Sequence, residues 1–123
     1  MAESATLSGS LSGSSKFGPL TPVAINYAMS SLEGHAQINV PVEPTDSLKS
    51  MTMPQLDGQQ RLFLMVVDGN GSVQVRVNGN ASLVFDLQPN APVMWGNAPD
   101  VTQLEFTGNG SDKVIVQITK LTE

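Results

Sequence analysis

The sequence has no cysteine, so disulfides and thiolate metal sites are excluded and the fold has to be stabilised by packing. Aromatic residues make up only 5% of the 123 residues, so the core has to consist mainly of Val, Leu, Ile and Met. Charged residues make up 14%, against about 25% in an average globular protein. A surface this poor in charge favours a protein that packs against neighbours.

Positive charge is especially scarce, because six Lys and Arg residues stand against eleven Asp and Glu residues. They form no basic cluster, which argues against binding to nucleic acid or to an anionic membrane surface. No apolar run approaches the ~20 residues of a membrane-spanning helix. The N-terminus also lacks the basic and apolar regions of a signal peptide, so we expect synthesis in the cytoplasm.

Catalytic motifs are also lacking. His35 is the single histidine and follows Gly34 in a turn-like position, where a solvated side chain is the usual finding. Neither a nucleophile elbow nor a phosphate-binding glycine loop occurs. Asp86 and Glu105 alternate with apolar strand residues, so we place them on the outer faces of strands and assign them no reaction. We therefore expect no enzyme and no catalytic residue.

One segment resembles the start of a calcium-binding loop, Asp68-Gly69-Asn70-Gly71-Ser72. The helical calcium loop needs Gly at its sixth position and Glu at its twelfth, and these positions hold Val73 and Gly79. We interpret the segment as a hairpin turn and expect no metal site and no cofactor. The alternative is a weak calcium site built from Asp68, Asp100 or Asp112 at the loop tips.

What the sequence does contain is turn chemistry. Asn-Gly pairs occur at Asn70-Gly71, Asn78-Gly79 and Asn109-Gly110, each beside alternating apolar and polar residues. Asn and Gly tolerate the positive φ that tight hairpin turns need. The pattern predicts an antiparallel β fold over residues 61–120.

Short alternating segments fill most of the remaining chain. Residues 23–29 favour a strand, with a short helix after Pro22 as the alternative, and Pro41 indicates that 36–42 forms an edge strand. A long polar connection, 43–60, contains Met51 and Met53, which could cover one end of the core. Further strands are predicted at 61–68, 73–77, 83–87, 93–95, 103–107 and 114–119.

These segments predict an all-β fold, an antiparallel β-sandwich or jelly roll of about eight short strands. One apolar set supplies the predicted core: Leu64, Val66, Val75, Leu83, Phe85, Leu104, Phe106, Val116 and Ile118.

The first 18 residues differ from the rest in composition, being rich in Ser and Gly. We predict a flexible N-terminal arm over 1–18 and a β-sandwich domain over 19–123. If the arm orders on a partner, Leu7, Leu11 and Phe17 are its candidate anchors. Trp95 is the further candidate for partner binding, although a tryptophan that fills the end of a small core is the alternative.

The segment 73–107 combines three pieces: Val-Gln-Val-Arg-Val-Asn-Gly-Asn, Phe-Asp-Leu-Gln-Pro-Asn-Ala-Pro-Val-Met-Trp, and Val-Thr-Gln-Leu-Glu-Phe-Thr. With these pieces, about the last half of the chain resembles the small all-β accessory proteins of tailed bacteriophage particles. The resemblance implies a virion structural protein, such as a capsid decoration subunit or part of a head or tail appendage. Its partners would be other copies of itself, as a homo-oligomer, and other virion proteins. The alternative is a carbohydrate- or receptor-binding β-sandwich that uses Trp95, Tyr27 and polar loops.

Overall fold

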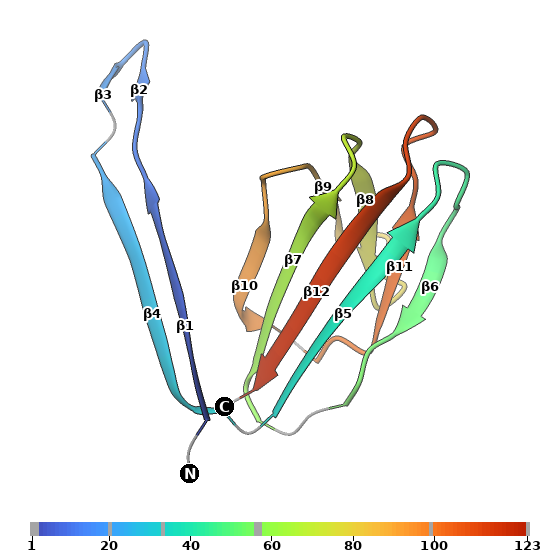
Figure 1. The fold of residues 1–123 in the computed structure, drawn as a ribbon, viewed down its shortest axis with the longest axis horizontal. Coiled ribbons are helices and arrows are strands. Elements are labelled where there is room, and N and C mark those ends of the chain that lie inside the picture. The colour runs from blue at the N-terminus through green and yellow to red at the C-terminus, as the bar shows by residue number, and fades with distance from the viewer. Residues whose placement is uncertain (1–2, 20, 33, 56–57, 99, 123) are drawn as a thin grey trace. The chain divides into compact units, whose positions relative to one another are not determined.

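A computed structural model describes the chain except for residues 1–2, 20, 33, 56–57, 99 and 123. The chain divides into two compact units, residues 1–32 and 33–123. Figure 1 labels the strands of both units.

The first unit is a two-stranded antiparallel ribbon, residues 3–32, which we call the N-terminal ribbon (Figure 1). Strand β1 (Glu3–Leu11) pairs with β4 (Val23–Leu32), and two short strands, β2 (Ser14–Ser15) and β3 (Gly18–Pro19), pair near the turn. One set of opposed residues is polar or small and exposed: Thr6, Ser8, Ser10, Ala24, Asn26 and Ala28.

The unit boundary in the structure differs from the one that composition suggested. We expected an arm over 1–18 and a domain from 19, whereas the contacts separate the units after Leu32. The Ser- and Gly-rich segment includes β1, whose partner is the strand predicted at 23–29. That strand is confirmed as β4, and the alternative helix is wrong. The physical reason is that alternation in 23–32 provides a template on which a weak strand former can pair.

The second unit consists of two four-stranded antiparallel sheets, one in front of the other (Figure 1). The first sheet has the order β10-β7-β12-β5 and the second has the order β6-β11-β8-β9. The strands are β5 (Gly34–Val42), β6 (Lys49–Thr52), β7 (Gln60–Asp68), β8 (Val73–Val77), β9 (Val84–Leu87), β10 (Val93–Ala98), β11 (Gln103–Thr107) and β12 (Val114–Thr122). Among the residues that the structure describes there is no helix, so the predicted all-β class is confirmed.

The pairing of these strands is nested. β5 pairs with β12, β6 with β11, β7 with β10, and β8 with β9. Two further pairings, β7 with β12 and β8 with β11, join the nested pairs into the two sheets. β5 is an edge strand, as Pro41 indicated.

The inward side chains of both sheets form one core. Seven of the predicted core residues are buried in it: Leu64, Val66, Val75, Leu104, Phe106, Val116 and Ile118. Phe85 is only partly buried, and the prediction for Leu83 is wrong because 37% of this residue is exposed. Leu83 precedes β9 and its amide closes a turn on the carbonyl of Asn80, so the alternation of β9 does not extend to it.

The Asn-Gly pairs form different turns. Asn78 and Gly79 have φ values of 53° and 66°, and the amide of Asn80 donates to the carbonyl of Val77 at 2.9 Å, as in a type I′ turn. At Asn109-Gly110 only the glycine has positive φ. In the first pair neither residue has positive φ, which falls instead on Gly69, at 93°.

The connection 43–60 contains a strand that alternation did not predict, β6, which pairs with β11. Its register places Met51 opposite Leu104, and Met53 follows it into the core with 2% exposure. The expectation that these methionines cover the core is confirmed. In the described part of the chain, no helix is long and apolar enough to cross a membrane.

Candidate binding surface

The outer face of the β10-β7-β12-β5 sheet carries apolar side chains on its β10 side. Met94 of β10 lies opposite Phe63 of β7, and Met65 follows Phe63 on the same face. Met94 is 45% exposed and Met65 is 37% exposed. Toward β5 the same face becomes polar, and the amide of Gln37 donates to the hydroxyl of Thr119 at 3.1 Å.

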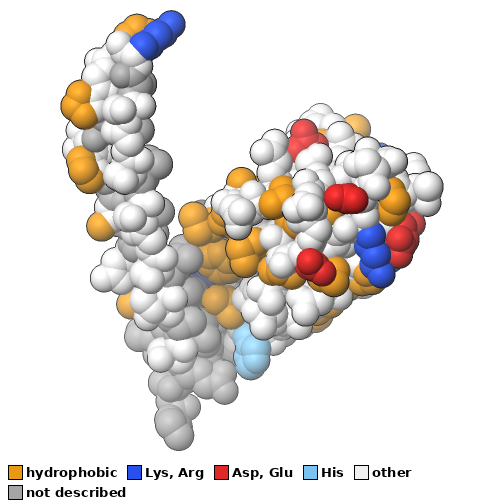
Figure 2. Space-filling model, turned by 45° about the horizontal axis from the view of Figure 1, so that its top comes forward, with side chains coloured by type: hydrophobic (Ala, Val, Ile, Leu, Met, Phe, Trp, Pro, Cys, Tyr) orange, Lys and Arg blue, Asp and Glu red, His pale blue; other side chains and the backbone are white. Residues whose placement is uncertain are grey.

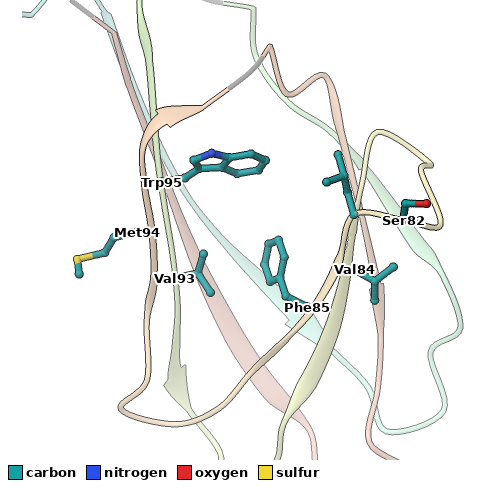
Figure 3. Close-up of a pocket in the computed structure, with 7 residues that line it drawn as sticks. Ser82, Val84, Phe85, Val93, Met94 and Trp95 are labelled. Carbon is teal, nitrogen blue, oxygen red and sulfur yellow. The ribbon is translucent and has the colours of Figure 1, made fainter.

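An apolar cleft opens at the neighbouring edge, between β9 and β10. Its volume is about 280 Å³, and Ser82 contributes the one polar side chain among its described lining residues. Trp95 and Val93 of β10 point toward Phe85 of β9, whereas Met94 points away from them (Figure 3). All three inward side chains pack on the buried core, which explains why Trp95 is half-buried.

The outer apolar face and the cleft meet at β10. We call this continuous surface the β10 margin, and define it by six residues: Phe63, Leu83, Val84, Met65, Met94 and Trp95. In Figure 2, hydrophobic side chains gather on the left side of the two-sheet unit, where β10 lies in Figure 1. Charged side chains spread over the remainder of the visible face of that unit.

β10 is also an edge strand. Within its sheet it pairs with β7 alone, and its register shifts between Trp95 and Ala98. Its six residues, Val93–Ala98, carry no charge. A sheet edge leaves backbone donors and acceptors on its open side, and charged residues are the usual protection against pairing with another strand. β10 lacks that protection.

The outer face of the other sheet has a different chemistry. Arg76 of β8 lies opposite Glu105 of β11, and its guanidinium donates two hydrogen bonds to the carboxylate, at 3.1 and 2.7 Å. Glu105 lies on the outer face of its strand, as its alternation predicted, yet it is only 7% exposed because Arg76 lies against it. Beside this pair, the amide of Gln103 donates to the hydroxyl of Ser50 at 2.7 Å. The polar groups of this face bind one another.

Lys120 is the one buried ammonium group among the described residues. It lies on the inner face of β12 and donates to the carbonyl oxygens of Pro54 and Val101, at 2.8 and 3.2 Å. Burial lowers the pKa of Lys120, and the charge of Asp100 opposes this shift. The two acceptors belong to connecting segments, so Lys120 holds these segments to the end of the core. This contact gives it a structural role.

The candidate residues from the sequence are distributed over both units. Phe17 lies near the turn of the N-terminal ribbon, is 89% exposed, and has the Lys16 ammonium 5.2 Å from its ring centroid. Leu7 and Leu11 belong to β1, but their side chains lie outside what the structure describes. Trp95 alone lies in the β10 margin.

Sequence reasoning missed the outward apolar residues of the margin. The segment 61–68 is apolar at nearly every position, which we interpreted as a central strand. β7 is central in its sheet, yet Met65 and Val67 are exposed because no second layer covers that face within their unit. The signal that could have found them is apolarity on both faces of a strand in a two-layer fold.

In the described ranges, no three His, Asp or Glu side chains gather to hold a metal ion. Comparison of the chain with family models, with curated proteins and with solved structures found no match.

Proposed function

We propose that this protein is a non-enzymatic structural subunit of a bacteriophage particle. It would decorate or cement the capsid, or form part of a head or tail appendage, through contacts with copies of itself and with other virion proteins. It would be made in the host cytoplasm and function in the virion.

The observation that carries the proposal is the nested strand pairing of the second unit. Eight strands that pair first with last, second with seventh, third with sixth and fourth with fifth have the order of a jelly roll. Double-sheet jelly rolls occur in viral capsid proteins and in lectins. We therefore assign the second unit to the jelly-roll class of β-sandwich, and the step from this fold to a function is an analogy.

The surface supports a role in assembly over catalysis. The β10 margin exposes methionine, leucine and valine side chains, and exposed apolar patches mark protein contact sites. Its cleft has little polar lining, whereas active sites bring several polar groups together. The low proportion of charged residues in the chain also supports a role in assembly, since charged residues are depleted at the centre of interfaces.

Mass spectrometry of particles purified from infected cells tests the proposal. We expect this chain to remain with the particles through density-gradient centrifugation, at a constant copy number relative to the major capsid protein. A particle fraction that lacks the chain, while the chain is abundant in the lysate, contradicts a virion role.

The cleft supports a second candidate function, carbohydrate or receptor binding. Tryptophan offers a flat apolar surface on which a sugar ring can stack, and Trp95 is half-buried at the mouth of the cleft. Specific sugar binding also requires hydrogen-bond partners for the hydroxyl groups, and among the described lining side chains only the Ser82 hydroxyl and the Trp95 indole N–H offer them. Glycan-array binding that is lost in Trp95→Ala favours this candidate over assembly.

A further inference from the structure

We propose that β10 accepts the N-terminal ribbon of a second copy of this chain, so that the first sheet continues across the contact. The inference rests on the proposed assembly function and deepens it, because it names the surface and the segment that occupies it.

The acceptor offers both parts of a strand-addition site. The open edge of β10 supplies backbone hydrogen-bonding groups, and the uncharged sequence Val93–Ala98 does not repel an added strand. Apolar surface flanks this edge on both sides, with Met94 on the outer face and Trp95 at the cleft. An added strand would therefore gain hydrogen bonds and apolar contacts together.

The donor has the matching properties. An isolated two-stranded ribbon is at best marginally stable in water, so the ribbon has to gain stability from a further contact. Residues 4–15 and 17–32 carry no charge. The register opposes Leu7 to Tyr27 and Leu11 to Val23, so that apolar positions of one strand pair with apolar positions of the other. β4 has ten residues, more than the six of β10.

The connection favours a second copy over the same chain. One residue separates the end of β4 at Leu32 from the start of β5 at Gly34, which allows a span of about 7 Å. β5 and β10 form opposite edges of their sheet, so a strand added to β10 lies about 19 Å, or four strand spacings, from β5. With β4 and β5 at their full lengths, this connection is too short, whereas a second copy has no such restriction.

Chemical cross-linking between differently labelled copies tests the contact. The chain has no cysteine, so Ser8→Cys in the ribbon and Met94→Cys in β10 each introduce a single thiol. Isotope-labelled Ser8→Cys protein is mixed with unlabelled Met94→Cys protein. The mixture is treated with a bismaleimide whose arm is shorter than the width of the four-stranded sheet. We expect a product that joins the two, and little product when Val67→Cys replaces Met94→Cys. Equal yields of the cross-linked product with Met94→Cys and with Val67→Cys overturn the inference.

Sedimentation equilibrium of the full chain tests the energetics. We expect self-association that Met94→Lys weakens by about tenfold or more, because a charge on an edge strand opposes pairing. Val67→Lys is the matched control, since Val67 is similarly exposed, at 44%, but lies beyond the segment of β7 that pairs with β10. A wild-type chain that stays monomeric, or equal effects of the two variants, overturns the inference.

These results separate the inference from the proposed function. Copies that join through β10 but are absent from purified particles contradict the virion role and leave the contact standing. A chain that is present in particles, but whose cross-links avoid β10, contradicts the contact and leaves the virion role standing.

Discussion

The strands of both sheets in the second unit alternate between inward and outward residues in the same way. The two outer faces differ in what their outward side chains contact. On the β6-β11-β8-β9 sheet, Arg76 and Glu105 bind one another across the strands. On the β10 side of the other sheet, Met94 and Phe63 are the opposed residues, and Met94 is 45% exposed. The first face satisfies its groups within the chain, whereas the second leaves apolar area in water, which a partner can cover.

The largest expected effect is a loss of stability on substitution at the inner face of the sheets, compared with substitution at the exposed outer face. Phe106→Ala should lower the free energy of unfolding by about 3–5 kcal/mol, because Phe106 is fully buried between the sheets. Met65→Ala, on the outer face, should change it by no more than about 0.5 kcal/mol. Urea denaturation of both variants measures the contrast. Similar losses would mean that the outer face is part of the core.

The second largest effect concerns the polar face. Arg76→Met should cost about 1–3 kcal/mol, because it leaves the nearly buried Glu105 carboxylate without its bidentate partner. The double variant Arg76→Met with Glu105→Gln should recover part of that loss. A double-mutant cycle by urea denaturation measures the coupling. Purely additive losses would show that the two side chains do not stabilise one another.

A smaller effect depends on pH and concerns Lys120. Its lowered pKa means that the folded chain loses this proton at a lower pH than the unfolded chain does. Between those two pKa values the unfolded chain binds more protons, so the free energy of unfolding rises with pH, by at most about 1.4 kcal/mol per pH unit. Relative to Lys120→Met, the wild type should gain stability as pH increases toward the ordinary lysine pKa of 10.5. A pH-independent difference contradicts this assignment.

The smallest expected effect on stability is that of removing the ribbon. A chain that begins at residue 33 should unfold cooperatively with a Tm close to that of the full chain, because the core cluster lies wholly within the second unit. Calorimetry of the two chains measures the difference. A chain that fails to fold would show that the ribbon belongs to the domain.

Local pattern was a good guide wherever one strand face met the core. The alternation of 73–77 and 103–107 predicted that Val75 and Phe106 are buried, and both are. The pattern failed at Leu83, where a turn interrupts the alternation. It also failed at β6, because the residues of β6 do not by themselves indicate a strand that pairs with β11. It also failed to indicate that Asn78 accepts hydrogen bonds from the amides of Thr102 and Gln103, because that contact spans distant segments.

The candidate site was predictable in part. Trp95 was identified by residue type, because a lone tryptophan is informative in any small β protein. Its neighbours in the cleft are Phe85 of β9 and Leu83, which precedes β9, and both were interpreted as core. Whether they line a cleft depends on how the edge of one sheet is placed beside the edge of the other. No local sequence pattern encodes that placement.

The sequence by itself determined the all-β class, the turns, and the inward residues of most strands. It did so because side-chain alternation and positive-φ turn chemistry are local properties of the chain. The tertiary structure alone decided the nested order of the strands, the pairing of β1 with β4, and the exposure of the β10 margin. The reason is that an apolar side chain becomes core or surface only when the sheets take their places, and two faces with similar alternation then have different surroundings.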